Sequence, residues 1–72
     1  MYKSLNIIDK EATAKKLHKI RTQRKLTMKQ LADLCGLSAQ SICAIENAQK
    51  EPRICNLQKI ADALGVTIEK LM

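Results

Sequence analysis

Two helix-start signals with a glycine between them constrain the fold of this chain more than any other feature of its sequence. The first is Thr27 followed by Gln30, the pattern of a capping box, in which each side chain accepts a hydrogen bond from the other residue's backbone amide. This pattern predicts a helix over Met28–Cys35. Gly36 then ends the helix, because glycine adopts the positive φ of a helix C-terminus at little steric cost.

The second signal is Ser38, an N-cap residue that predicts a helix over Ala39–Glu46. Two short helices joined through a turn that contains glycine form a helix-turn-helix. The motif needs a small residue where the helices cross, which Ala32 supplies, and branched buried residues on the second helix, which Ile42 and Ile45 supply. The buried face is completed by Leu31, Cys35 and Leu37. Together these features predict a helix-turn-helix over residues 28–46.

Similar signals predict three further helices, from Asp9 to about Arg24-Lys25, over Ile54–Leu64 and over Ile68–Met72. Asp9 and Thr67 are the expected N-caps, and Gly65 is the expected end of the helix that precedes Thr67. Only Leu5-Asn6-Ile7-Ile8 has some character of a strand. The predicted fold class is therefore all-α, a compact five-helix domain.

The composition fits one small domain. Its 72 residues lie near the lower size limit for a self-supporting core, and Tyr2 is the one aromatic residue, so aliphatic side chains must fill that core. We expect an N-terminal arm over residues 1–9 and the helix-turn-helix domain over residues 10–72. The chain has no run of about 18 or more apolar residues and begins with a segment too polar for a signal peptide. No membrane association is expected, and a cytoplasmic location is favoured.

The charge balance leaves two interpretations open. Thirteen Lys and Arg against seven Asp and Glu give a net charge of +6. A solvated basic surface is enough to explain this excess. A polyanionic partner such as nucleic acid explains it equally well, because contacts to phosphates release counterions and so drive binding.

The chain offers little for metal or covalent chemistry. A four-ligand zinc site would need His18 together with Cys35, Cys43 and Cys55, which have no CxxC spacing, so no metal or other cofactor is expected. No carboxylate pair, nucleophile–base set or glycine-rich phosphate loop is recognisable, so we expect no enzyme activity and no small-molecule ligand. Cys43 is expected to be a small apolar filler, with a redox switch as the alternative.

The sequence resembles the repressor/Cro-like helix-turn-helix family, also called the Xre family, over about Leu17–Leu71. The matching stretches are Ile20-Arg21, Leu26-Thr27-Met28-Lys29-Gln30-Leu31-Ala32, Cys35-Gly36-Leu37-Ser38, Ser41-Ile42-Cys43-Ala44-Ile45-Glu46-Asn47, Pro52-Arg53 and Ile60-Ala61-Asp62-Ala63-Leu64-Gly65-Val66-Thr67. The resemblance implies that the third of five helices enters the major groove of DNA. It also implies an internal salt bridge between Arg21 and Glu46. Without the resemblance, these two residues would be expected to be exposed charges.

The residues expected to reach base edges lie on the outer face of the helix over Ala39–Glu46. They are Ala39, Gln40, Ser41 and Ala44. Gln40 is the foremost candidate, because its amide can bond both N6 and N7 of adenine. Ser41 suits several bases, and the two alanines suit a thymine methyl group. The alternative for Gln40 is an ordinary solvated residue of a helix.

The residues expected to contact phosphates lie at helix N-termini and in the loop that follows the second helix of the motif. They are Thr27, Lys29, Ser38, Asn47, Lys50 and Arg53. Each has a simpler role as a cap or surface residue, and capping is the expected main role of Thr27 and Ser38. Lys15, Lys16 and Lys19 are expected to add electrostatic steering only.

Three positions depart from the family's pattern. Met28 stands where a glutamine commonly contacts phosphate, so that contact is expected to be lost. Ala48 replaces a frequent glycine and costs about 1 kcal/mol if its backbone is left-handed. Arg53 replaces a frequent serine cap, which weakens the cap but adds a cation near DNA.

We therefore expect a small transcriptional regulator, a repressor in preference to an activator, that binds a palindromic double-stranded operator as a homodimer. Two copies then place their recognition helices roughly 34 Å apart. The alternative is a protein-interaction module of the same fold, such as an antitoxin or anti-regulator. The apolar residues left for a dimer contact are Ile68, Leu71, Met72 and the segment Leu5–Ile8.

Overall fold

The structure is a computed structural model that describes residues 9–72. The expected arm over residues 1–9 falls outside the described residues except for Asp9, and so does Leu5–Ile8, with its strand character and its suggested dimer contact. No helix in the described part of the chain is long and apolar enough to cross a membrane.

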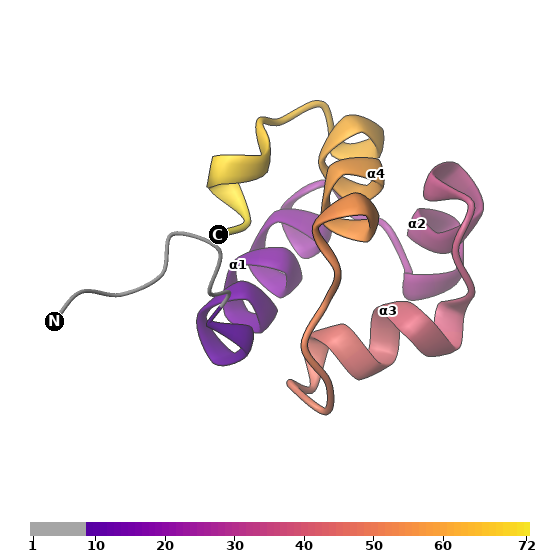
Figure 1. Ribbon diagram of the computed structural model, residues 1–72. Helices are drawn as coiled ribbons and strands as arrows, with labels where there is room; N and C mark the ends of the chain where they lie inside the picture. The colour runs from indigo at the N-terminus through magenta and orange to yellow at the C-terminus, as the bar shows by residue number, and fades with distance from the viewer. Residues whose placement is uncertain (1–8) are drawn as a thin grey trace, which may run out of the picture.

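The described residues form four α-helices and one 3₁₀ helix (Figure 1). These are α1 (Lys10–Gln23), α2 (Met28–Cys35), α3 (Ala39–Glu46), α4 (Ile54–Leu64) and η1 (Ile68–Lys70). The bounds predicted for the helices now labelled α2, α3 and α4 are confirmed. The all-α class is confirmed for residues 9–72, where no strand occurs.

The expected fifth α-helix over Ile68–Met72 is not confirmed. In its place stands the three-residue η1, in which the amides of Lys70 and Leu71 donate to the carbonyls of Thr67 and Ile68, three positions back. The Thr67 side chain makes no cap hydrogen bond, so the first turn lacks the N-terminal support predicted for it. These i to i+3 bonds are those of a 3₁₀ turn, which occurs in short pieces such as this one.

The first helix begins and ends largely as its sequence predicts. The Asp9 carboxylate accepts from the amides of Glu11 and Ala12, at 3.1 and 3.2 Å. The helix closes at Arg24, and Lys25 follows with a left-handed φ of 58°. The Arg24 guanidinium donates to the carbonyl of Leu64 at 2.9 Å, which ties the end of α1 to the end of α4. This contact spans 40 positions and was not predicted.

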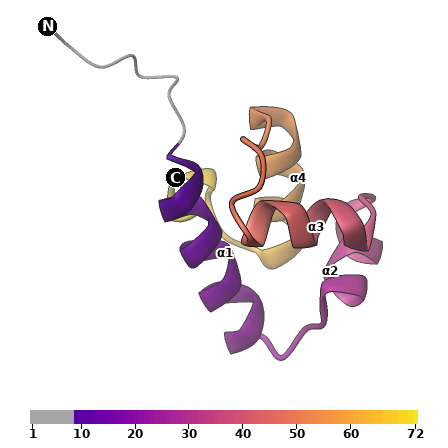
Figure 2. The same cartoon turned by 90° about the horizontal axis from the view of Figure 1, so that it is seen from below.

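The core lies between the helices and is aliphatic. Its fully buried side chains include Leu17, Leu31, Ile42, Ile45, Leu57, Ile60 and Leu71. The helix α3 packs against both α1 and α2, and α4 packs against α2 and η1. In Figure 1, α3 runs along the lower side of the domain, and Figure 2, the view from below, shows it at the front. One side of α3 is therefore left at the molecular surface.

The burial of Leu71 corrects the expected dimer surface. Leu71 is 0% exposed and belongs to the core, because η1 turns its side chain inward. Ile68 and Met72 are half-buried and pack against the same core. The apolar residues at this end of the chain thus complete the fold, and Leu71 has no surface to offer to a second copy.

Candidate nucleic-acid interface

The turn between α2 and α3 is built by local hydrogen bonds. The Thr27 hydroxyl accepts from the Gln30 amide at 3.0 Å, and the Gln30 side chain accepts from the Thr27 amide at 2.8 Å. Gly36 has a φ of 77°, and its amide and that of Leu37 both donate to the carbonyl of Ala32. The predicted capping box and left-handed glycine are both confirmed.

Ser38 fixes the start of α3 with two hydrogen bonds to Ser41. Its Oγ accepts from the Ser41 amide at 3.0 Å and donates to the Ser41 hydroxyl, also at 3.0 Å. The predicted N-cap is confirmed. Because the Ser41 oxygen already accepts this bond, the hydroxyl of Ser41 has its own hydrogen available as a donor.

The outer face of α3 is composed of small and uncharged side chains. Ala39 and Gln40 are exposed, whereas Ser41, Cys43 and Ala44 are half-buried. The two exposed residues occupy the first turn, the part of a recognition helix that contacts base edges. Of the four expected base-reading residues, Gln40 is the one that is exposed and has a side chain that both donates and accepts hydrogen bonds.

The far end of α3 is held by α1. Arg21 Nε donates to Glu46 Oε2 at 2.5 Å, and Arg21 Nη2 donates to Glu46 Oε1 at 2.9 Å. The side chains of Arg21 and Glu46 are only 10% and 2% exposed. The remaining Arg21 nitrogen, Nη1, donates to the carbonyl of Leu26 at 2.6 Å. The structure thus brings the two residues of the expected salt bridge together in a two-pronged geometry, which is the strong form of such a pair.

The hydrogen bond to Glu46 raises the pKa of Arg21, against the opposing effect of burial. The guanidinium therefore keeps its charge inside the domain. His18, one turn before Arg21, adds a further contact: its Nδ1 lies 3.0 Å from Glu46 Oε1. The sequence analysis predicted no contact for His18, because periodicity carries no signal for a contact across 28 positions.

The loop after α3 carries the departure predicted at Ala48. Its φ is 54°, in the left-handed region that disfavours a residue with a Cβ atom. Gln49 donates to the carbonyl of Ala44 at 2.9 Å, which closes the turn. The loop then enters α4 at Arg53, which occupies the N-cap position and makes no side-chain cap bond. The weakened cap predicted at this position is therefore present.

A hollow of about 230 Å³ lies between α3 and the start of α4, and we call it the exit hollow. Its lining residues are Ser41, Ile45, Lys50, Glu51, Pro52, Arg53 and Asn56. It brings together two expected phosphate-contacting residues, Lys50 and Arg53, with Ser41, which was expected to read bases. Asn56 was not predicted, because nothing in the sequence before folding links it to α3.

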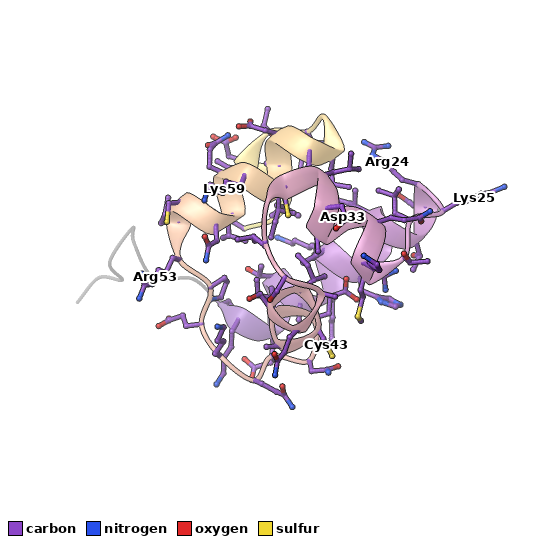
Figure 3. The ribbon with its side chains drawn as sticks, turned by 90° about the vertical axis from the view of Figure 1, so that its right-hand side faces the viewer. Arg24, Lys25, Asp33, Cys43, Arg53 and Lys59 are labelled. Carbon is purple, nitrogen blue, oxygen red and sulfur yellow. The ribbon has the colours of Figure 1, made fainter. Side chains whose placement is uncertain are left out.

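The other expected phosphate-contacting residues are spread along the motif. Thr27 and Ser38 are exposed caps, and Lys29 is exposed with its Nζ 3.6 Å from Asp33 Oδ2. Asn47 is exposed, and its side-chain amide donates to the Cys43 sulfur at 3.3 Å. Figure 3 shows Cys43 on α3 and Arg53 before α4, on separate parts of the surface.

The described residues hold no group of three His, Cys, Asp or Glu side chains arranged to take a metal ion. The three cysteines are unpaired: Cys35 is buried, Cys43 is half-buried and Cys55 is exposed.

Two N-capped helices that meet at a left-handed glycine, with the second helix at the surface, define a helix-turn-helix domain. The family described as Helix-turn-helix, HTH_3, matches residues 17–71. The chain belongs to this helix-turn-helix family of transcriptional regulators. The resemblance to the Xre family is thereby confirmed, over nearly the same residues from which it was inferred.

Two curated relatives and one solved structure illustrate the family. The HTH-type transcriptional repressor RghR of Bacillus subtilis is 40% identical over 63 residues, which cover 86% of this chain and 47% of that protein. The immunity repressor protein of Bacillus phage phi105 is 36% identical over 53 residues, 74% of this chain and 37% of that protein. The restriction-modification controller protein C.AhdI from Aeromonas hydrophila is 28% identical, with a TM-score of 0.85, and the match covers 89% of this chain and 97% of that one.

The chain thus spans about half or less of the length of these curated relatives, but nearly all of the solved controller protein. The shared part is the helical domain that contains the motif.

Proposed function

We propose that this chain binds double-stranded DNA in a sequence-specific manner and represses transcription, with α3 in the major groove. The observation that carries the proposal is the state of α3: its first turn is exposed, while its last residue, Glu46, is fixed by a buried ion pair. A helix held rigidly at one end can present its other end to base edges in a defined register. Binding involves no chemical step, so no enzyme activity is proposed.

Gln40 is the proposed principal reader, through paired hydrogen bonds to adenine. Ala39 and Ala44 are proposed to pack on thymine methyl groups. Because these side chains are short, the backbone of α3 can approach the floor of the groove closely, and the width of the groove then contributes to specificity. Ser41 is proposed to donate its hydroxyl hydrogen either to a base or, from the exit hollow, to a phosphate.

Phosphate contacts are proposed on both sides of α3. Lys50 and Arg53 line the exit hollow together with Glu51, so its two exposed cations outweigh one exposed carboxylate and leave a net positive charge for a phosphate oxygen. On the other side, Thr27, Lys29 and Ser38 lie at the N-termini of α2 and α3, whose free amides favour anions. Asn47 is proposed as a further contact. The ion pair with Asp33 is exposed, so Lys29 can exchange it for a phosphate at little cost.

A homodimer on a palindromic operator is proposed as the working unit, with the recognition helices of its two copies roughly 34 Å apart. A location in the cytoplasm stays a prediction. A fifth regular helix over Ile68–Met72 is also proposed, as an extension of η1, because the Met72 amide already donates to the carbonyl of Ile68, four positions back.

The test is enrichment of random duplexes at low salt, followed by fluorescence anisotropy with the best duplex across a salt series. We expect a preferred sequence and an affinity that falls steeply with salt, since several phosphates are contacted. If no sequence is preferred even at low salt, the proposal fails. The same fold would then act as a protein-interaction module.

A further inference from the structure

A second basic hollow lies on the other side of the domain, between α1 and η1. Its volume is about 310 Å³, and we call it the lysine hollow. Its lining residues are Lys16, Lys19, Ile20, Gln23 and Lys70. Four of them come from α1, and Lys70 is brought to them because η1 folds back beside α1 (Figure 1). Lys16 and Lys19 were expected only to steer DNA electrostatically.

The lysine hollow faces away from α3. At 3.6 residues per turn, positions 16, 19, 20 and 23 share one side of α1. His18 and Arg21, which contact Glu46 of α3, share a side roughly opposite to it. A duplex with α3 in its major groove therefore lies across the domain from this hollow, and both surfaces can be occupied at the same time.

The lining has a definite chemistry. Lys16, Lys19 and Lys70 are exposed, and in the described part of the chain none of them lies in an ion pair. Ile20 is half-buried, and the aliphatic stems of the lysines extend its apolar surface. An occupant that satisfies this lining carries several negative charges and at least one apolar group.

A bare phosphate fits less well. Phosphate sites commonly use free amides at a helix N-terminus. Residues 16–23 lie inside α1 or in its last turn, where the amides are already engaged in the helix. The hollow therefore offers side-chain cations and apolar surface, without a cradle of backbone donors.

We propose that the lysine hollow binds an acidic segment of a protein partner, with carboxylates at Lys16, Lys19 and Lys70 and an aliphatic side chain over Ile20. This gives the domain a protein contact that is separate from DNA binding and compatible with it. The proposal does not depend on the proposed function, because its binding partner and its surface are different.

The test is a titration of the full 72-residue chain with a fluorescently labelled peptide, Glu-Glu-Leu-Glu-Glu, and separately with duplex DNA. The variant is Lys16→Gln with Lys19→Gln. The matched control is Lys15→Gln with Lys59→Gln, which removes the same charge from exposed positions outside both hollows. We expect the variant to lose about tenfold in peptide affinity, from the loss of two surface ion contacts, and the control less than twofold. The affinities of the variant and the control for duplex DNA should differ from each other by less than twofold.

Two results would overturn the proposal. An equal loss of peptide affinity in variant and control would mean that the peptide responds to net charge alone. A selective loss of duplex affinity in the variant would mean that the hollow belongs to the DNA surface. Lys70→Gln provides an independent arm from η1, with an expected loss of about threefold for the peptide. If the wild-type chain binds no duplex at all, the proposed function is wrong. The peptide affinities of variant and control still test the present proposal.

Discussion

The two ends of α3 are held in different ways. At its start, Gly36 and Ser38 fix the chain through bonds that span no more than five positions. At its end, Glu46 is fixed by Arg21 across 25 positions, and the next turn places Ala48 in a left-handed conformation. The start of α3 is thus determined locally, whereas its end depends on α1. The C-terminal end of α3 should therefore lose its structure before the N-terminal end when long-range contacts are removed.

The largest expected effect comes from the buried ion pair. Arg21→Met leaves the buried Glu46 carboxylate with His18 as its one remaining side-chain contact, which should lower the free energy of unfolding by about 3–5 kcal/mol. The measurement is urea unfolding followed by circular dichroism. The matched control is Lys29→Met, which breaks the exposed pair with Asp33, whose side chains are 78% and 68% exposed, and should cost less than about 1 kcal/mol.

A double variant sharpens this prediction. Arg21→Met with Glu46→Leu replaces the pair by apolar side chains of similar size and should recover most of the loss, because no charge is left buried. Equal, small losses in Arg21→Met and Lys29→Met would contradict the claim that the end of α3 depends on α1.

The next effect concerns the start of α3. Gly36→Ala should lower the free energy of unfolding by about 1–2 kcal/mol, because its φ of 77° disfavours any Cβ atom. The added methyl group would meet nothing within 4 Å, so the backbone alone is responsible. Gly65→Ala, with a φ of 71° and equally open space, is the matched comparison for urea unfolding. If Gly65→Ala lowers the free energy of unfolding and Gly36→Ala does not, the turn before α3 can change its backbone conformation without loss of stability.

A smaller effect of the opposite sign is expected at the end of α3. Ala48→Gly should raise the free energy of unfolding by roughly 0.5–1 kcal/mol, since glycine relieves the left-handed backbone. Ala44→Gly, inside α3, should lower it by roughly 0.5–1 kcal/mol. Thermal unfolding of both variants distinguishes them by sign. Destabilisation in both would mean that Ala48 is under no backbone strain.

The last effect on stability, of similar size, comes with a loss of binding. Arg53→Ser introduces a cap at the start of α4 and should stabilise the domain by roughly 0.5–1 kcal/mol. It also removes a cation from the exit hollow, so affinity for DNA should fall and the slope of affinity against salt should decrease by about 1. Arg53→Ala is the control that loses the cation without gaining a cap. Unchanged salt dependence in both variants would remove Arg53 from the interface.

The contrast between local and long-range contacts also explains what could be predicted from the sequence. The bounds of α2 and α3, the capping box of Thr27 and the role of Gly36 depend on residues that are neighbours in the chain, and all were predicted from it. The pairing of Arg21 with Glu46 came from the family resemblance, because periodicity carries no signal about contacts 25 positions apart.

Contacts of long range account for what was missed. The His18 contact with Glu46 and the Arg24 bond to the Leu64 carbonyl join helices whose packing had to be known first. Leu71 was expected at the surface, since a pattern of apolar residues near an end does not show which of them the core takes up. The exit hollow likewise joins Ser41 to Arg53 only after α4 has packed.

The central claim is that the exposed first turn of α3 reads the bases, with Gln40 as the principal contact. The most direct test is enrichment of random duplexes with the wild-type chain and with Gln40→Ala, under the same salt. We predict that the wild type prefers an adenine at one position of each half-site, and that the variant loses this preference while it keeps the rest of the sequence. Identical preferred sequences for the two proteins would contradict the account.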